Sequence, residues 1–431
     1  MSKQAQQIAV IGSGISGLAC AYRLGQAGHQ VTLYEAADYF GGHTHTVDVS
    51  LGGITYGVDT GFLVFNHQTY PNLVKLFAEL QVETVPTDMS FSVKHALSQR
   101  TLEWAGGNLD AVFAQRRNLL SPRFWNMLRD ILRFNRDATE LAAAPSHRDA
   151  MLSLGDFLTR HHYGAAFRDW YLLPMAGCIW SCPTAQMLDF PISTFARFCH
   201  NHGLLQVSGR PQWWTVKGGA RHYVDKMLAG IADTRLNTPV IGITRTDLGS
   251  KRRVCVDTRS GQDYFDHVVL ATHSDQALKL LRDAFPSEQR VLSAIRYQPN
   301  RAVLHTDTRC LPGLRKTWSA WNYQSRSGRE PQVCVHYLIN TLQPLPFKES
   351  VIVSLNPIDA PDPAHVIAKF DYAHPVFDAA AIEAQRNLDL IQGYHNVWYA
   401  GAWTGYGFHE DGLKSGLAVA QAIVAAGRKN G

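Results

Sequence analysis

The pattern of apolar and polar positions at the start of the chain predicts a strand, a helix and a second strand. Gln7–Ile11 is an apolar run suited to a buried parallel strand. Ser16–Ala27 has the apolar spacing of a helix, and Gly28 ends it. Gln30–Glu35 is a second strand-like run. Because a helix separates two buried strands, the pattern predicts a βαβ unit in a parallel sheet.

The pattern changes along the rest of the chain. From about Thr60 to Gly209, helical spacings, aromatic residues and arginines dominate, which predicts a separate helical region. Strands are predicted again at Thr238–Arg245, Arg253–Thr258, Phe265–Thr272 and Val397–Ala400. A final helix is predicted at about Asp411–Ala426, after a glycine-rich turn.

The places where strands return predict an α/β fold with two domains. The parallel-sheet domain is expected to be assembled from three segments, 1–60, 210–273 and 395–431. The second domain is expected to consist of 61–209 and 274–394, inserted between those segments. A chain of 431 residues is long enough for two such domains.

Composition narrows the class of protein. Charged residues make up 18% of the chain and the formal net charge is +5, which excludes a heavily basic nucleic-acid-binding protein. The seven cysteines are scattered and odd in number, so no disulfide framework is expected. Met1–Gln7 lacks the apolar core of a signal peptide, and no apolar run is long enough to span a bilayer. The expected location is the cytoplasm.

A glycine motif follows the first predicted strand. Gly12, Gly14 and Gly17 form GSGISG at the start of the first helix. In such a motif the glycines permit a tight turn and let the backbone approach a diphosphate, which sits on the N-terminus of the helix. Glu35 ends the second strand and is placed to accept hydrogen bonds from a ribose, while its charge disfavours the 2′-phosphate of NADP. The motif therefore predicts a dinucleotide site.

Two further glycine-rich turns favour FAD over NAD. Gly41 and Gly42 follow the second predicted strand, and a second strand-to-helix turn lies in Gly401–Gly416. NAD does not need that second turn, whereas the N-terminus of its helix can stabilise negative charge on a reduced flavin. Only one GxGxxG occurs, so no separate NADPH domain is predicted. The predicted cofactor is FAD.

These motifs resemble the flavin amine oxidase superfamily, which includes monoamine oxidases, protoporphyrinogen oxidases and carotenoid desaturases. The resemblance rests on GSGISGLACAYRLGQAGHQVTLYEAADYFGGHT, on TPV at 238–240, on DHVVLAT at 266–272 and on FHEDGLKSG near the C-terminus. It implies a GR2-type FAD-binding Rossmann-like domain with an inserted α+β substrate domain. The cofactor-binding residues that it implies are Gly12, Ser13, Gly14, Ile15, Ser16, Gly17, Glu35, Ala36, Gly41, Gly42, His43, Thr44, Gly61, Phe62, Val240, Ala271, Thr272, Gly401, Ala402, Gly412, Leu413 and Gly416.

A narrower resemblance covers nearly the whole chain. Bacterial flavoproteins associated with cyclopropane-fatty-acid-synthase-like methyltransferases, and the N-terminal part of plant cyclopropane fatty acid synthases, are similar to VDTGFLVFNHQTYPNL, IWSCPTAQMLDFP, NHGLL, GRPQWWTVKGG and YAGAWTGYGFHEDGLKSG. This resemblance implies an acyl-lipid substrate and a lipid methyltransferase as partner. Desaturation of methyl-branched chains is one reaction that it implies.

Several positions depart from the superfamily pattern. His43 follows the glycine pair where arginine is usual, and Ala402-Trp403 stands where an acidic residue often holds the ribitol. Amine oxidases generally carry a lysine near the flavin in a strand of the form Ala-Val-Ile-Lys, and its counterpart here is His305. That departure counts against amine oxidation. No cysteine follows Cys334, which excludes a C-terminal thioether link, so FAD is expected to be bound non-covalently.

His305 and His409 are the candidate catalytic residues. A histidine can act as a base or hold a water, but a strand histidine such as His305 can also be a hydrogen-bonded core residue. His409 and Glu410 either line the flavin or cap the last helix. Tyr406 and Phe408 either form a wall of the flavin site or only pack in the turn.

No metal site is predicted. Zinc needs four converging ligands. The candidate cluster consists of Cys178, Cys182, Cys199, His200 and His202. Its first two cysteines are one residue farther apart than in a CxxC motif. The cysteines of this cluster are expected to be small buried apolar residues.

The segment 113–136 is a candidate for interaction with a membrane. It carries six arginines against one aspartate. Phe124, Leu128, Ile131 and Leu132 fall on one helical face. A basic amphipathic helix of this kind can lie on an anionic bilayer and admit a lipid. It can equally pack its apolar face on the protein and keep its arginines in water.

Four functions follow from these residues and resemblances. The first is oxidation of a hydrophobic substrate by hydride transfer to FAD, as in acyl-chain desaturation. The second is amine oxidation, and the third is a redox-neutral double-bond isomerisation that uses the flavin. The fourth is a non-catalytic flavin domain that serves a lipid methyltransferase.

Overall fold

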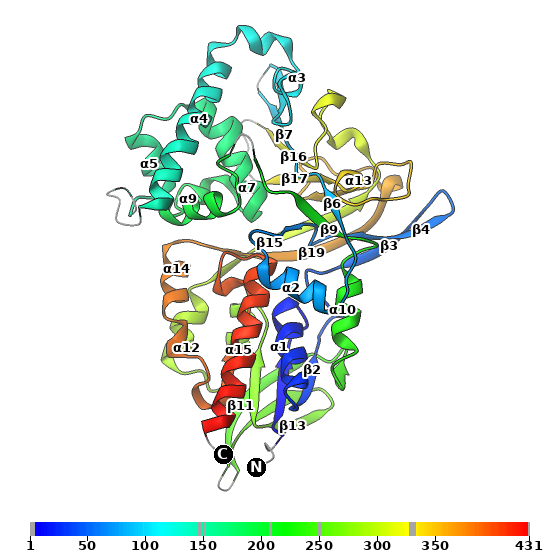
Figure 1. The fold of residues 1–431 in the computed structure, drawn as a ribbon, viewed down its shortest axis with the longest axis vertical. Helices are drawn as coiled ribbons and strands as arrows, with labels where there is room; N and C mark the ends of the chain where they lie inside the picture. Colours follow the sequence, from blue (N-terminus) through cyan, green and yellow to red (C-terminus); the bar gives the residue numbers. More distant parts are fainter. Residues whose placement is uncertain are drawn as a thin grey trace.

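The chain folds into two α/β halves stacked along the long axis of the molecule (Figure 1). The computed structural model describes residues 5–97, 99–144, 149, 151–206, 209–248, 251–326 and 333–429. Residues 1–4, and the parts of the predicted domain ranges that fall between these stretches, lie outside the described residues. Both termini lie at the end of the lower half (Figure 1).

A five-stranded parallel sheet forms the centre of the lower half. Its order is β10 (Asp233–Arg235), β2 (Gln30–Tyr34), β1 (Gln7–Ile11), β14 (His267–Leu270) and β20 (Val397–Tyr399). The strands therefore come from three separated parts of the chain. Strand side chains alternate between the two faces, so Ile8 and Val10 join one core cluster while Ala9 and Ile11 join another.

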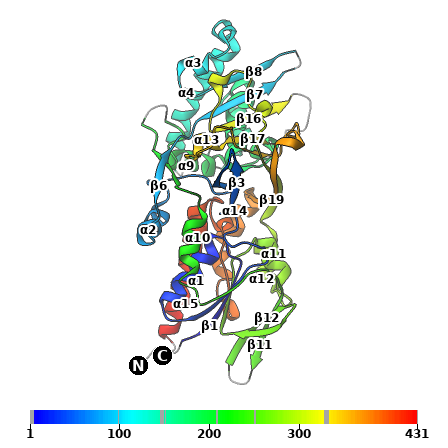
Figure 2. The ribbon, with the colours of Figure 1, turned by 90° about the vertical axis from the view of Figure 1, so that its right-hand side faces the viewer.

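One face of this sheet is covered by helices that pack very closely. They are α1 (Ile15–Gln26), α15 (His409–Lys429), α10 (Arg221–Leu228) and α2 (Pro71–Glu79). A Cβ at Gly416 would lie 2.1 Å from the Ser16 carbonyl oxygen, and a Cβ at Gly17 would lie 1.9 Å from the Gly12 oxygen. Glycine is required at both positions because the backbones touch. Figure 2 shows α1, α10 and α15 on one side of the sheet.

The opposite face carries a small antiparallel sheet and three helices. The sheet consists of β11 (Val240–Leu248), β12 (Lys251–Thr258) and β13 (Gly261–Phe265). The helices are α11 (Ser274–Leu280), α12 (Pro286–Ser293) and α14 (Ala379–Arg386). These helices come from 274–394, the range expected for the second domain, yet they pack on the parallel sheet. The division of the core therefore differs from the predicted ranges.

A seven-stranded sheet forms the base of the upper half. Its order is β19 (Val366–Val376), β15 (Arg296–His305), β18 (Ile352–Leu355), β17 (Cys334–Leu338), β16 (Trp321–Arg326), β7 (Phe91–Ala96) and β8 (Thr101–Ala105). Smaller pairings join β3 (Thr46–Leu51) to β4 (Ile54–Asp59), and β9 (Trp213–Val216) to β5 (Phe65–Asn66) and β6 (Thr84–Thr87).

The strands β7 and β8 interrupt a region that was predicted to be helical. Their buried positions include polar residues, which obscures the apolar alternation. Ser92 is fully buried and donates to Asn322, and the carboxylate of Glu103 accepts from the backbone N–H groups of Gly313 and Leu314. These partners are more than 200 residues away, so the sequence pattern does not reveal them.

The helices of the upper half pack on that sheet and on one another. They are α3 (Leu109–Val112), α4 (Pro122–Ala143), α5 (Leu154–Arg160), α6 (Ala165–Phe167), α7 (Leu173–Trp180), α8 (Thr184–Met187), α9 (Ile192–Asn201) and α13 (Ile339–Leu342). A one-turn helix η1 (Arg116–Leu120) precedes α4. Aromatic residues of α4, α5, α6 and α9, such as Phe134, Phe157 and Phe195, form one buried cluster.

The apolar face predicted for 113–136 is directed into the protein. Phe124 is fully buried, and Leu128 and Ile131 are half-buried against the same core. Leu132, which was expected on that face, is 60% exposed. The apolar face therefore follows the alternative in which the helix packs on the upper half, and contact of the segment 113–136 with a membrane stays a prediction.

Candidate functional site

A cavity of about 760 Å³ lies where the two halves meet. The carboxyl ends of β1, β2, β14 and β20 form its lower end, which is where parallel α/β sheets bind ligands. Residues of β16, β17, α7 and α9 form its upper end. Each end therefore has its own chemistry, a polar glycine-rich one below and an aromatic one above.

The lower end is built to accept a diphosphate. Residues 12–16 line the cavity, and α1 begins at Ile15 with Gly14 as its cap and no side chain bonded to its free N–H groups. Such a helix start attracts anions through its N–H groups and its dipole. A Cβ at Gly14 would enter open space, whereas Gly42 approaches so closely that its Cβ would lie 3.0 Å from Gly14 Cα. The glycines thus leave a space that side chains would fill.

Glu35 is held rigidly at this end. Its carboxylate accepts from the Ser13 N–H at 2.9 Å, the Ser13 hydroxyl at 2.5 Å and the Ala37 N–H at 2.9 Å. A carboxylate has about four acceptor positions, so one remains for a ribose hydroxyl. Glu35 and Ala36 both line the cavity. Glu35 thus has room for one further donor at the cavity wall, and its ribose-binding role stays a prediction.

Most of the other predicted cofactor residues also line the cavity. They are Gly41, Gly42, His43, Gly61, Phe62, Val240, Ala271, Thr272, Gly401 and Ala402. Gly17, Thr44, Gly412, Leu413 and Gly416 do not line it. Gly17, Gly412 and Gly416 serve the contact between α1 and its neighbours, Leu413 is fully buried in the core, and Thr44 bonds the Tyr223 hydroxyl. These five residues therefore support the cavity wall without lining it.

His43 occupies the position where the superfamily usually has arginine. His43 lines the cavity wall, and its buried Nε2 atom has no hydrogen-bond partner within the protein. Burial, with His374 nearby, lowers the pKa of His43 well below its usual value, so the ring is neutral. A neutral histidine can donate one hydrogen bond to the cofactor but supplies no positive charge. An unpaired buried polar atom costs stability, and a bound FAD would give it a partner.

Trp403 replaces the acidic residue that often follows the C-terminal glycine. Its indole N–H donates to the Thr272 carbonyl at 3.1 Å, which ties the end of β20 to the end of β14. A Cβ at Gly401 would lie 2.2 Å from that indole nitrogen. Trp403 therefore shapes the cavity wall and gives no carboxylate to a ribitol.

His409 lines the cavity and is held in one orientation. Its ring stacks on Phe62 with centroids 3.8 Å apart, and its Nε2 bonds the Tyr223 hydroxyl at 2.7 Å. Burial lowers the pKa of His409 to about 3, so it is neutral near pH 7. Glu410 has neither predicted role. Its carboxylate accepts from the N–H groups of Asn72 and Leu73 and so caps α2.

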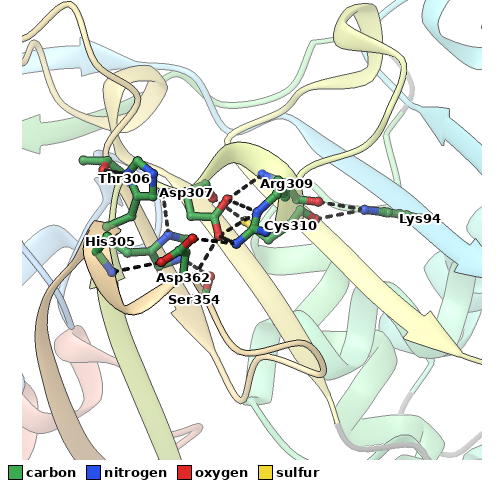
Figure 3. A network of polar contacts seen from close by, with 10 residues as sticks. Lys94, His305, Thr306, Asp307, Arg309, Cys310, Ser354 and Asp362 are labelled. Carbon is green, nitrogen blue, oxygen red and sulfur yellow. Dashed lines mark hydrogen bonds and ion pairs between the residues drawn. The ribbon is translucent and has the colours of Figure 1, made fainter.

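His305 lies outside the cavity wall and in the core of the upper sheet. It is fully buried, and both ring nitrogens are bonded, Nδ1 to the Asp307 N–H at 3.1 Å and Nε2 to the Ser354 hydroxyl at 2.6 Å. Figure 3 shows His305 between Ser354 and Asp307. The structure therefore does not place His305 to act as a base or to hold a water at the cavity. The core histidine interpretation is the one that fits.

The bonds of His305 continue into a buried chain. Because the Asp307 N–H can only donate, His305 Nδ1 accepts and Nε2 donates to Ser354. Ser354 then donates to His336 Nδ1 at 2.6 Å, and His336 Nε2 donates to the Gln324 carbonyl oxygen at 2.8 Å. Each polar group of this chain has a hydrogen-bond partner as long as both histidines stay neutral.

A His305→Ala variant is expected to keep wild-type flavin content, flavin spectrum and turnover while losing stability. Removing one member of the buried chain leaves Ser354 without its donor, which costs about 1–3 kcal/mol. The measurement pairs chemical denaturation with flavin titration. His409→Ala is the control at the cavity, where the flavin spectrum is expected to change. A His305→Ala protein that is stable but inactive would restore a catalytic role for His305.

The buried histidines predict acid-sensitive stability. Burial lowers the pKa of His305 to about 4 and that of His336 to about 3, against about 6.5 in an unfolded chain. The unfolded chain is protonated first, so the stability is present above pH 6.5 and is lost as the pH falls towards 4. Each histidine contributes up to about 1.4 kcal/mol per pH unit. Denaturation midpoints between pH 7 and pH 4.5 should fall less steeply in His336→Gln, and equal slopes would contradict this assignment.

The upper end of the cavity is aromatic and aliphatic. Its lining includes Leu63, Val64, Met89, Cys178, Ile179, Phe198, Leu204, Trp213, Trp321, Tyr337 and Phe408. Among the described lining residues, the one carboxylate is Glu35, and the one lysine is Lys279 beside Gln276 and Leu280 of α11. The upper end therefore offers contact to an apolar group and no counter-charge to a cation.

Sequence reasoning missed most of this upper wall. Phe408 was proposed as a wall residue and does line the cavity, whereas Tyr406 does not. The others lie on separate strands and helices with no shared motif. A signal existed for the wall residues that stand in the quoted segments and for His273, which follows DHVVLAT directly. The former are Leu63 and Val64 in VDTGFLVFNHQTYPNL, Ile179 in IWSCPTAQMLDFP, Leu204 in NHGLL and Trp213 in GRPQWWTVKGG. No group of metal-ligating side chains occurs among the described residues, and Cys178, Cys182 and Cys199 are buried.

Comparison with known proteins gives one matching family model and several solved structures with a similar fold. The family model described as flavin containing amine oxidoreductase matches residues 15–424. Among solved structures, a CLA-producing fatty acid isomerase from P. acnes has a TM-score of 0.68 at 17% identity, over 98% of this chain and 99% of that one. Cyclohexylamine oxidase from Brevibacterium oxydans IH-35A has a TM-score of 0.67 at 15% identity, over the same shares. Identities this low concern the fold alone.

Curated relatives match over short segments. A 1-hydroxycarotenoid 3,4-desaturase from Flavobacterium sp. (strain P99-3) is 41% identical over 78 residues, which are 17% of this chain and 14% of that protein. A 15-cis-phytoene desaturase from Synechococcus elongatus is 36% identical over 77 residues, 18% of this chain and 15% of that protein. The chain thus matches a small part of the length of these relatives.

Proposed function

The chain belongs to the flavin-containing amine oxidoreductase family and is an FAD-dependent oxidoreductase, and on that premise we propose that it dehydrogenates a hydrophobic acyl chain. The upper wall of the cavity carries this proposal. Its described residues are mostly apolar or aromatic, with Ser181 and His202 as polar members, and include no carboxylate. Ligand sites of this kind gain their affinity from apolar contact. A methyl-branched fatty acyl chain is the substrate that we propose.

The chain's own residues divide the work between the two ends of the cavity. Residues 12–16 and Glu35 would hold the dinucleotide, the unpaired Nε2 of His43 would be available to it, and His409 stays neutral beside Phe62. Bound FAD supplies a hydride acceptor at N5. Trp213, Trp321 and Tyr337 exclude water from an acyl chain beside the flavin. The proton that leaves with the hydride needs a base, and at the upper end the neutral imidazole of His202 supplies one, because its Nδ1 donates to the Phe198 carbonyl and leaves Nε2 as the acceptor.

Amine oxidation is less well supported by the same residues. A protonated amine would gain from a carboxylate at the upper end, and the described lining has none there. The counterpart of the amine-oxidase lysine, His305, is also bonded within the core. Redox-neutral isomerisation of an acyl double bond would use the same cavity, so the products must distinguish it from desaturation. A lipid methyltransferase partner remains part of the proposal, drawn from the sequence resemblance.

Product analysis separates these functions. Holoprotein would be incubated with a methyl-branched phospholipid and either oxygen or a quinone, and the acyl chains analysed by mass spectrometry. Desaturation predicts the loss of H₂ from the acyl chain, dependent on the acceptor. A moved double bond with unchanged mass, formed without an acceptor, would mean isomerisation. Hydrogen peroxide from simple amines would mean amine oxidation. No turnover alone, with turnover restored by a methyltransferase, would mean a partner role.

A further inference from the structure

A rigid apolar and basic surface lies at the end of the upper half, away from both termini (Figure 1). It is formed by α3, η1 and the first turns of α4, and we call residues 109–125 the tip. Leu109 is 77% exposed, Leu120 88%, Trp125 49% and Leu119 44%. Large apolar side chains gathered on one exposed segment mark an interaction surface.

The tip is held in shape by the residues beneath it. The indole N–H of Trp125 donates to the Leu119 carbonyl at 2.9 Å, which fixes its ring against η1. Phe113 is buried and packs on Trp125 with centroids 5.2 Å apart. The Ser121 hydroxyl accepts from the Phe124 N–H and caps α4. The exposed leucines therefore stand on a folded base.

Basic residues surround these apolar side chains. Arg116, Arg117, Arg123 and Arg129 are exposed on η1 and α4. The short helix η4 (Arg315–Thr317) packs beside α3 and adds exposed Arg315 and Lys316. Within 106–129 and 313–318, all of which are described, the one acidic residue is Asp110, which pairs with Arg116 and Lys316. The positive charge thus exceeds the negative charge at the tip.

We propose that the tip docks on the surface of an anionic lipid bilayer, with Leu119, Leu120 and Trp125 inserted among the headgroups. Leucine and tryptophan beside arginine are the composition of interfacial membrane contacts. Basic side chains near an anionic leaflet strengthen such binding, and salt weakens it. Contact stays peripheral, since among the described helices none has the length and apolar content to cross a bilayer. The inference deepens the proposed function, because docking would bring the cavity to an acyl-lipid source.

Vesicle sedimentation with the full-length holoprotein tests this proposal. Binding is expected to vesicles of phosphatidylcholine with phosphatidylglycerol, to be weak on phosphatidylcholine alone, and to fall as salt rises. A Leu119→Ser, Leu120→Ser double variant is expected to lower the partition coefficient at least about 10-fold. An Arg116→Gln, Arg315→Gln variant is expected to lower it about 10-fold at low salt. Leu390→Ser is the matched control, because Leu390 is 64% exposed in the lower half, and should bind as wild type.

The outcomes separate docking from turnover and from self-association. Equal binding by wild type and the leucine double variant, with matching flavin content and melting curves, would overturn the proposal. A wild-type dimer that the leucine substitutions convert to a monomer, without vesicle binding, would assign the tip to a second copy of the chain. Vesicle binding is measured without turnover, so it is independent of the proposed reaction. Conversely, oxidation of a detergent-dispersed lipid tests the reaction without the tip.

Discussion

A Gly14→Val variant should fold as the wild type does and lose FAD. Gly14 has φ −60° and ψ 172°, an extended conformation that valine adopts without strain. Its Cβ would meet no atom within 4 Å, and Gly14 lines the cavity at the start of α1. The valine side chain would therefore occupy the space that the diphosphate needs. We expect the dissociation constant of FAD to rise at least about 100-fold, a loss of about 2.7 kcal/mol.

Two other glycines make this prediction specific. Gly107 is exposed and also has open space around it, so Gly107→Val should retain both fold and flavin. Gly17→Val should fail in a different way, because a Cβ there would lie 1.9 Å from the Gly12 carbonyl oxygen. The measurements are circular dichroism of the apoprotein and fluorescence titration with FAD. A Gly14→Val protein that binds FAD as tightly as wild type would place the diphosphate elsewhere.

An Ile179→Asp variant should keep FAD and lose affinity for the acyl substrate. Ile179 lies on α7 and lines the upper end of the cavity, away from the glycine-rich turns. Without substrate a carboxylate there can remain hydrated, but an acyl chain would remove its water. Burying a charge against an apolar group is unfavourable, so we expect KM to rise at least about 30-fold, or about 2 kcal/mol. Steady-state kinetics and the flavin spectrum measure the two effects separately.

Two further variants at Ile179 separate the effect of charge from the effect of side-chain shape. Ile179→Asn should raise KM by less than Ile179→Asp, because an amide is less costly to desolvate than a carboxylate. Ile179→Leu should leave KM nearly unchanged. If Ile179→Asp kept the wild-type KM for acyl lipid, the acyl chain would not lie along α7.

The nucleotide end of the site could be predicted from sequence because its determinants are local. Gly12, Gly14 and Glu35 lie within one βαβ unit, where spacing along the chain fixes spacing in the fold. The second glycine-rich turn adds Gly401 and the start of α15, a similar strand-to-helix connection. Both of these features can be recognised without knowing which distant strands pair.

The substrate end could not be predicted in the same way. Trp321 and Tyr337 face each other across β16 and β17, and β16 also pairs in parallel with β7, over 200 residues away. Such register depends on tertiary contacts and not on local spacing. Trp321 and Tyr337 therefore stand in none of the motifs quoted from the sequence.

The direction of the His305 side chain could not be predicted because the end of its strand is buried. Ala302, Val303, Leu304 and His305 are all buried, so the strand has no polar face to indicate direction. The pairing of β15 with β19 also shifts register between Leu304 and His305. That irregularity, and the partner Ser354 on β18, decide where the imidazole lies. A comparison of sequence motifs contains neither the register shift nor the Ser354 partner.

Anaerobic reduction of the bound flavin is the most direct test of the central claim, that this FAD oxidoreductase oxidises an acyl chain. The holoprotein's visible spectrum would be recorded without oxygen as a methyl-branched phospholipid in non-ionic detergent is added, with a simple primary amine in a parallel titration. The proposed function predicts that the lipid bleaches the two-band flavin spectrum and the amine does not. A flavin that stays oxidised with lipid, or that only the amine bleaches, would contradict it.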